Sequence, residues 1–143
     1  MSDPRAAISN IGTGYRALTF AIDNSTITYL ATAAGGSSQV GLAVTFSTDN
    51  TVKLTEDGEH VLGKLISVGA DNFATVQVGG VCTLPSGAGA TLTLGEKIVG
   101  DLDTAAKGYI RAVATGTAGE LGHARGAIHN NNTTTAVVVD LDG

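Results

Sequence analysis

Residues 63–84, GKLISVGADNFATVQVGGVCTL, contain two runs in which apolar and small polar residues alternate. The first run ends at a turn signal, Gly-Ala-Asp-Asn at 69–72, and the second carries a glycine pair at 79–80. Alternation places successive side chains on opposite faces of a strand, while Gly and Asn suit tight turns. The stretch therefore predicts two strands, with a bulge or sharp bend at the glycine pair. The side chains expected to form the sheet face are Leu65, Ile66, Val68, Phe73, Val76, Val78 and Val81.

The same cadence continues on both sides of this stretch. Further strands are expected at 39–47, 51–55, 61–68, 90–94, 96–102, 108–115, 123–130 and 135–141. Only residues 103–108 and 117–124 are expected to form single helical turns. Short strands at close intervals, with no helix-length periodic segment between them, predict an all-β fold, either a compact β-barrel or a β-sandwich.

Composition limits the classes of protein to which the chain can belong. Its 143 residues fit one domain, which at this size buries roughly 68–70% of the unfolded surface. With 4% aromatic residues and no Trp, the core must consist mainly of Ala, Val, Leu and Ile. A net charge of −5, with eight scattered basic residues, argues against a nucleic-acid partner. No apolar run approaches the roughly 18 residues of a membrane span, and no signal-peptide pattern is present, so we expect a soluble protein made in the cytosol.

The first third of the chain differs from the rest. Residues 1–14 show no period and contain Pro4, Gly12 and Gly14, which predicts an extended arm without a core of its own. Residues 15–33 alternate and predict a β-hairpin that turns at 23–25, with Leu18, Phe20 and Ile22 on one strand and Ile27 and Tyr29 on the other. We therefore expect an N-terminal arm at 1–34 and an all-β domain at 35–143.

One glycine motif and one cysteine have alternative readings. Residues 11–17, IGTGYRA, match the Gly-x-Gly-x-x-Ala form of a dinucleotide-binding turn. That turn binds a pyrophosphate only after a buried strand and at the start of a helix, and neither flank is predicted here, so no cofactor is expected. Cys82 is alone in an apolar strand, which excludes an internal disulfide framework and indicates a small buried apolar side chain.

Other groups capable of chemistry are few and scattered. They are His60, His123 and His129 with Glu120 nearby, Ser86, and the pairs Asp101 with Asp103 and Asp140 with Asp142. The histidine spacing matches no compact zinc pattern, and the aspartate pairs lie outside any calcium-loop pattern. The serine is in no Gly-x-Ser-x-Gly elbow. We therefore expect no catalytic residue and no metal, and a protein that is not an enzyme.

Three segments together resemble the small capsid decoration, or cement, proteins of tailed bacteriophages. They are VGLAVTFSTDNTVKLTEDGEHVLGKLISV at 40–68, ATVQVGGVCTL at 74–84 and GYIRAVATGTAGELGHARGAIHNNNTTTAVVVDL at 108–141. In the last segment an Arg-Gly-Ala-Ile strand leads through a polar turn to a final Val-rich strand. The resemblance covers about three quarters of the chain and lies in a cadence of Gly, Val and Thr.

The resemblance implies a compact β-sandwich-like fold of the β-tulip type that binds the outside of an icosahedral capsid. It implies homotrimers at three-fold and quasi-three-fold positions, the major capsid protein as partner, and no catalytic residues. The protein would be made in the host cytoplasm and would reside on the exterior of the virion. In this family the N-terminal segment often touches the capsid or a neighbouring subunit, and residues 1–34 occupy that position here.

The arm contains our candidate interface residues, which are Tyr15, Arg16, Phe20 and Tyr29. Aromatic and Arg side chains are enriched at the energetic centres of interfaces. Fully extended, 34 residues reach on the order of 100 Å, enough to cross between subunits. The predicted hairpin would either complete the sheet of its own domain or pair with an edge strand of another chain.

Two other functions remain open at this stage. One is a β-sandwich module that binds a receptor or a carbohydrate on a virion or cell surface, although the chain offers no Trp and only three Tyr as sugar platforms. The other is a small hydrolase with a site at His123 and His129.

Overall fold

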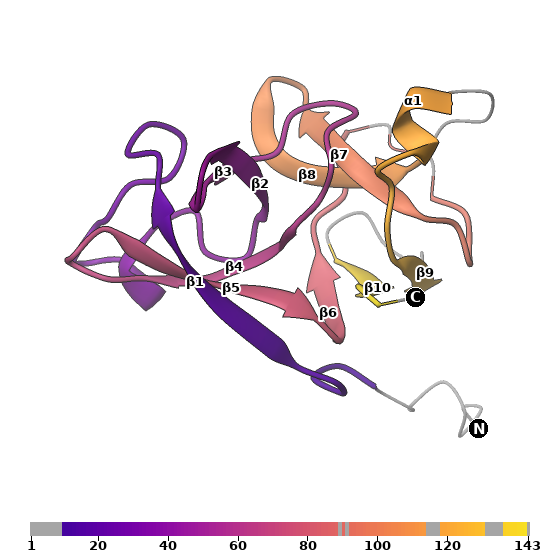
Figure 1. The fold of residues 1–143 in the computed structure, drawn as a ribbon. Helices are drawn as coiled ribbons and strands as arrows, with labels where there is room; N and C mark the ends of the chain where they lie inside the picture. The colour runs from indigo at the N-terminus through magenta and orange to yellow at the C-terminus, as the bar shows by residue number, and fades with distance from the viewer. Residues whose placement is uncertain (1–9, 89, 91, 114–117, 131–135, 143) are drawn as a thin grey trace.

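The expected all-β fold is confirmed, and of the two expected architectures, a barrel and a sandwich, the chain contains a closed barrel (Figure 1). The computed structural model describes residues 10–88, 90, 92–113, 118–130 and 136–142. These residues form a closed barrel, a three-stranded sheet and a two-stranded sheet. Their helical elements are the 3-10 turn η2 (Ala34–Gly36) and the single-turn helix α1 (Ala118–Leu121). Within the described part of the chain, no helix is long and apolar enough to cross a membrane.

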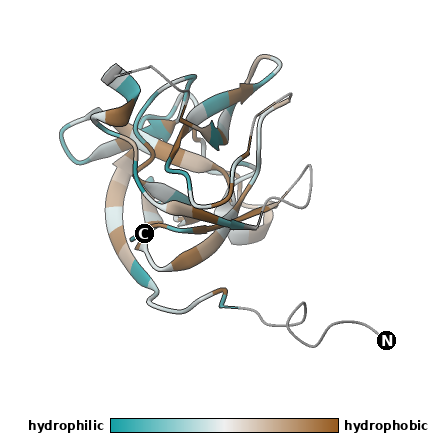
Figure 2. Ribbon diagram, turned by 90° about the vertical axis from the view of Figure 1, so that its right-hand side faces the viewer, coloured by the Kyte–Doolittle hydropathy of each residue, from teal (hydrophilic) through white to brown (hydrophobic). Residues whose placement is uncertain are grey.

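The barrel is built from the N-terminal part of the chain in the strand order β1-β3-β2-β4-β5. Its strands are β1 (Arg16–Ile22), β2 (Ala43–Thr48), β3 (Thr51–Leu54), β4 (Gly63–Val68) and β5 (Phe73–Gly79). β1 closes the barrel because it pairs antiparallel with β5 and parallel with β3. Apolar and polar stretches alternate along the strands (Figure 2), as expected when one face of each strand lines the interior.

Gly80 turns the chain out of the barrel, which confirms the bend predicted at the glycine pair. Its φ is +88°, and a Cβ there would lie 2.6 Å from the carbonyl carbon of Gly14, so only glycine fits. Beyond it, β6 (Val81–Leu84) pairs with β10 (Val137–Asp140), which pairs with β9 (Ala127–Asn130). β7 (Ile98–Asp103) and β8 (Ala106–Ala112) form the two-stranded sheet.

Two clusters of buried apolar side chains fill the molecule. One fills the barrel and includes Val44, Val52, Leu65 and Val76. The second is formed mainly by β6 to β10 and includes Leu84, Ile98, Ile110, Ile128 and Leu141. Cys82 belongs to the second cluster, and burial raises the pKa of its thiol to about 11. The thiol is therefore neutral at physiological pH, and the prediction of a small buried apolar side chain is confirmed.

Arg125 connects the barrel to the second cluster. Its Nη1 donates to the backbone oxygen of Leu62 at 2.8 Å, and its Nη2 donates to that of Val78 at 2.9 Å. Both carbonyls belong to residues of the barrel cluster. Nε and Nη2 also donate to the oxygen of Leu141, at 3.0 and 2.8 Å, and this residue belongs to the second cluster. One guanidinium group thus donates hydrogen bonds to residues of both the barrel cluster and the second cluster.

The predicted hairpin at 15–33 is wrong in its second strand. β1 forms, but residues 23–31 contain no strand. The Asp23 carboxylate instead accepts the backbone N–H groups of Ser25, Thr26 and Ile27 at 3.0 to 3.2 Å and folds this segment into a turn. The division of the chain at residue 34 does not follow the barrel, because the barrel takes β1 from one side and four strands from the other.

Three smaller segments have different outcomes. The helical turn expected at 103–108 is instead the tight connection between β7 and β8, where Thr104 has a φ of +62°. The described residues of the strand expected at 90–94, which are 90 and 92–94, form no strand. The helical turn expected within 117–124 is confirmed as α1. Of the expected arm, residues 1–9 lie outside the described residues.

Candidate interaction surface

Tyr15 and Arg16, two of the candidate interface residues, lie together on the surface at the start of β1. Tyr15 is 53% exposed, and the Arg16 guanidinium lies 3.5 Å from the Asp142 carboxylate in an exposed ion pair. The turn before them is fixed in place, since residues 12 and 13 exchange backbone hydrogen bonds of 2.9 Å with Val81. The N-terminal turn is therefore attached to β6 while its side chains face outward.

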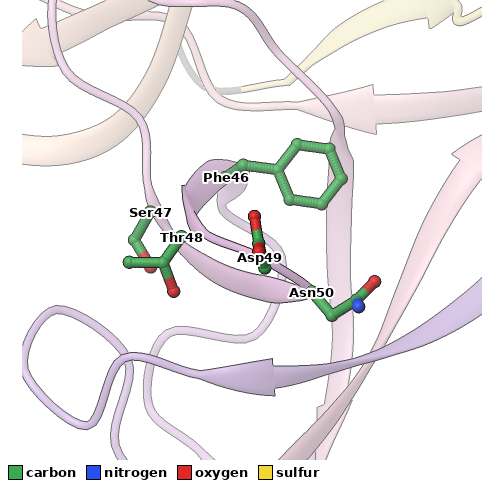
Figure 3. Close-up of a pocket in the computed structure, with 5 residues that line it drawn as sticks. All are labelled: Phe46, Ser47, Thr48, Asp49 and Asn50. Carbon is green, nitrogen blue, oxygen red and sulfur yellow. The ribbon is translucent and has the colours of Figure 1, made fainter.

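Phe20 is buried, which corrects its expected place in an interface. Its side of β1 faces the barrel interior, and its ring meets the ring of Phe46 edge-on, with centroids 5.4 Å apart. Phe46 was not singled out by the sequence patterns, although it ends an alternating run just before an Asp-Asn turn. It is 46% exposed and, with residues 47–50, lines a hollow of about 440 Å³ (Figure 3). Phe46 is thus an exposed aromatic group at this end of the barrel, together with Phe73, which pairs with Ala21.

Tyr29 lies at the opposite end of the barrel from Tyr15. The Tyr29 ring lies beside the end of β4. Both the ring and the carbonyl of Val68, the last residue of β4, lie next to Gly36, where an added Cβ would touch them. The turn from β4 to β5 lies beside the C-terminal end of β1, whereas Tyr15 precedes its N-terminal end. The structure therefore brings Tyr15 and Arg16 together, buries Phe20 and separates Tyr29 from them.

The histidines considered as metal ligands do not converge. His60 Nδ1 lies 2.9 Å from the backbone oxygen of His123, and His123 Nε2 lies 2.7 Å from that of Gly58. A carbonyl oxygen only accepts hydrogen bonds, so each of these ring nitrogens carries a proton. The two bonds hold the 56–60 loop against the residues that follow α1. His129 is exposed on β9.

Arg111, on β8, is the centre of a charged cluster. Its Nη1 and Nη2 donate to the two carboxylate oxygens of Glu120 at 2.9 and 3.0 Å, and its Nε donates to Asp57 at 3.1 Å. These bonds raise the pKa of Arg111, because both carboxylates favour the charged guanidinium. The cluster joins α1 to the 56–60 loop. Among the described residues, no group of three or more His, Cys, Asp or Glu side chains is arranged to hold a metal ion.

Asp101, on β7, is expected to lower stability at neutral pH. Burial raises the pKa of its carboxyl above the usual 3.8, and a hydrogen bond with the Asp57 side chain raises it further. The folded state then binds this proton more tightly than the unfolded state does. The free energy of unfolding therefore falls as pH rises from 3.8 through the folded-state pKa, and the loss persists at pH 7.

Asp101→Asn should remove this loss, because the amide is neutral and can donate to Asp57. Since the side chain is only partly buried, we expect a rise in Tm of about 1–2 °C at pH 7. Thermal unfolding followed by circular dichroism at pH 7 and pH 3 measures this rise, which should vanish at pH 3. Asp103→Asn removes the same charge two residues along the chain. An equal gain from that control would assign the effect to net charge and not to the pair with Asp57.

The glycine motif at 11–14 forms turns that lead into β1. The helix that would direct free N–H groups at a pyrophosphate is therefore replaced by a strand.

Comparisons of the chain with models of protein families, with curated proteins and with solved structures find no significant match. The structure itself thus defines the class, an all-β protein whose five-stranded barrel carries two small sheets.

Proposed function

We propose that this protein is a capsid decoration protein of a tailed bacteriophage. It binds the outer surface of the icosahedral shell as a homotrimer and stabilises the shell by bridging subunits of the major capsid protein. It acts by burying surface, without catalysis, cofactor or metal, on the virion exterior after synthesis in the host cytoplasm. Many weak contacts on a repeating lattice give firm attachment through avidity.

The observation that carries the proposal is the apolar N-terminal surface, formed by Ile11, Tyr15 and Leu18. These large side chains are 55%, 53% and 52% exposed and lie within eight residues of one another. Their backbone is attached to the folded body through Val81 and β5. Large apolar side chains that stay exposed on a fixed backbone are typical of a surface that a partner covers.

The architecture of the C-terminal segment also supports the proposal. The strand with the Arg-Gly-Ala-Ile motif and the final Val-rich strand, on which the resemblance rests, are the neighbours β9 and β10, with Ile128 opposite Val139. The two segments at the C-terminal end that carry the resemblance thus form neighbouring strands of one sheet.

A receptor- or carbohydrate-binding module is the second candidate. The observation in its favour is the hollow beside Phe46, where a half-exposed aromatic ring adjoins Asp49 and Asn50 (Figure 3). Aromatic faces with polar neighbours suit sugar rings. Binding on a glycan array, abolished by Phe46→Ala, would favour this function over decoration.

Removing the apolar N-terminal surface should weaken attachment to capsids. We expect the double variant Ile11→Ser with Tyr15→Ser to show at least roughly tenfold lower affinity, because anchors of this kind contribute 1–2 kcal/mol or more each. The measurement is occupancy on undecorated phage particles, by quantitative gel and cryo-electron microscopy, with density expected in threes above the shell.

The matched control is Leu94→Ser with Leu121→Ser. These side chains are 59% and 51% exposed and lie outside the N-terminal surface, so occupancy should not change. Equal occupancy for both double variants, with both proteins folded, would contradict the proposed surface. Density at the tail or fibres in place of the shell would contradict decoration itself.

A further inference from the structure

A groove of about 280 Å³ lies between the barrel and the three-stranded sheet. One side of it is formed by β4 and the segment that leads into β2, and the other by the end of β6, the residue after it and the residue before β10. Aliphatic residues predominate in the lining, with Val40 and Leu42 on the first side and Leu84 and Pro85 on the second. The groove therefore has mainly apolar walls.

Lys64 of β4 and Thr83 of β6 add two polar side chains to this lining. Leu65 is buried in the barrel, so the alternation along β4 directs the Lys64 side chain out of the barrel. Its Nζ donates to the Thr83 Oγ1 at 3.1 Å. The hydroxyl oxygen accepts this bond and keeps its own proton to donate, and the ammonium keeps further protons of its own. Two hydrogen-bond donors thus lie side by side in an apolar groove.

In the described part of the chain, Lys64 differs from other partly buried cations because it has no acidic partner. Lys53, Arg111 and Arg125 each lie 2.9 to 3.9 Å from a carboxylate oxygen. Lys64 forms no ion pair with a described residue, and the Thr83 hydroxyl is its hydrogen-bond partner. Withdrawing a charge from water costs free energy unless an opposite charge or hydrogen bonds offset the loss. The position therefore suits a negative group supplied by another molecule.

We infer that this groove binds the side-chain carboxylate of an Asp or Glu residue of a partner protein. A carboxylate only accepts hydrogen bonds and carries one negative charge, which matches one ammonium and one hydroxyl. A phosphate group is typically bound by an Arg cluster or by the N-terminus of a helix, and the described lining contains neither. The carboxylate would accept from Lys64 and Thr83, while aliphatic groups beside it in the partner would cover Leu42 and Pro85.

The size of the groove favours a partner's side chain over a free small molecule. Pockets that hold small molecules have volumes of about 300–1,000 Å³ and enclose most of the ligand. This groove is smaller, and Ala136 in its lining is exposed. A side chain needs little affinity of its own, because the rest of the interface holds it in place. The inference deepens the proposed function, on which the identity of the partner as the major capsid protein rests.

The charge of the chain gives such a contact a further role. With a net charge of −5, the chain repels acidic surfaces over most of its own surface. A single cationic groove that accepts a carboxylate would therefore fix the orientation in which the chain binds, since complementary charges set the register of an interface.

The first test compares the occupancy of variants on undecorated phage particles. Lys64→Met keeps the apolar stem of the side chain and removes its charge, and we expect at least roughly tenfold lower affinity. Lys64→Arg retains the charge and should retain most of the affinity. Lys97→Met is the matched control, since Lys97 is an exposed cation outside the groove, and its occupancy should equal that of the natural chain.

Urea unfolding separates binding from a structural role of Lys64. Because Lys64 has no acidic partner among the described residues, Lys64→Met should leave the unfolding midpoint unchanged or raise it. A midpoint lowered in parallel with the occupancy would overturn the inference, because the lysine would then support the fold. Thr83→Val removes the second donor and should lower the affinity by a smaller factor than Lys64→Met does.

The second test needs no capsid. The isotopically labelled full chain is titrated with the peptide N-acetyl-Glu-Leu-amide, whose one carboxylate is on the side chain, and separately with the neutral N-acetyl-Gln-Leu-amide. We expect weak binding of the Glu peptide, with NMR shifts centred on the amides of Leu42, Lys64 and Thr83, and about fivefold weaker binding of the Gln peptide. Hexanoate represents a free aliphatic carboxylate. Tighter binding of hexanoate than of the Glu peptide would overturn the assignment to a protein side chain.

The outcomes separate this inference from the proposed function. Particles that bind the natural chain and Lys64→Met equally would overturn the groove as a docking site and leave decoration standing. A natural chain that is absent from the particles would overturn decoration, and the two peptides would then decide on the groove. Equal binding of the Glu and Gln peptides would overturn the inference in either case.

Discussion

Replacing Arg125 with methionine is expected to lower the free energy of unfolding by about 3–5 kcal/mol, a large part of the stability of a single domain. The methylene chain of methionine fills similar space, so the loss comes from the guanidinium. Its bonds to the carbonyls of Leu62, Val78 and Leu141 disappear. Methionine donates to none of these oxygens, and leaving a buried acceptor without a partner costs about 1–3 kcal/mol.

The local electrostatics show that Arg125 acts mainly through these carbonyls. Burial lowers the pKa of Arg125. The Asp142 carboxylate beside it lies 3.9 Å away and is nearly half exposed. Arg111, with two closer carboxylates, has its pKa raised. Arg125→Lys should therefore recover only part of the loss, because one ammonium group cannot reproduce a planar fork that spans three carbonyls.

Urea unfolding, with the midpoint and the slope m both fitted, is the appropriate measurement. Lys107→Met is the matched control, since Lys107 forms an exposed ion pair with Glu56 at 3.3 Å, and such pairs contribute about 0–1 kcal/mol. Equal losses in the two variants would contradict the role of Arg125 as the connection between the barrel and the second cluster. A lower m for Arg125→Met would indicate that the two units unfold separately.

Strands β3 and β4 and the first half of β5 were predictable because buried and less buried positions largely alternate along them. The second half of β5 is buried on both faces, and the glycine pair that follows marks the bend because only glycine fits there. Ile27 shows where the pattern misleads. It is fully buried and alternates with Tyr29, but hydrogen bonds to the Asp23 side chain hold its backbone in a turn. Side-chain bonding to the backbone competes with strand formation and leaves the apolar pattern unchanged.

The contacts that matter most for the candidate sites depend on residues far apart in the sequence. Arg125 bonds to carbonyls at positions 62, 78 and 141, and any residue type supplies a carbonyl, so no motif marks the partners. The short pairing of β1 with β3 likewise depends on where β3 begins relative to β1, which is a matter of register. Phe20 and Tyr15 are both aromatic residues of the same segment, but Phe20 lies on the inward side of β1 and is buried, whereas Tyr15 precedes the strand and is exposed.

Gly63→Ala is the second substitution for which we expect a large effect, a loss of about 2–3 kcal/mol in the free energy of unfolding. A Cβ at Gly63 would lie 1.9 Å from the carbonyl oxygen of Gln77 on β5. Backbone cannot rotate away as a side chain does, so β4 and β5 must separate where Lys64 pairs with Gln77. That movement weakens the sheet beside Val76, in the centre of the barrel core.

Gly119→Ala makes the same chemical change in the opposite setting. A Cβ at Gly119 meets nothing within 4 Å, and the residue lies in α1, where alanine is favoured over glycine by about 1 kcal/mol. The control should therefore be neutral or stabilising in the same urea titration, while Gly63→Ala shifts the midpoint down with little change in m. If Gly63→Ala were as stable as the natural chain, β4 and β5 would be less closely packed at this point than the structure has them.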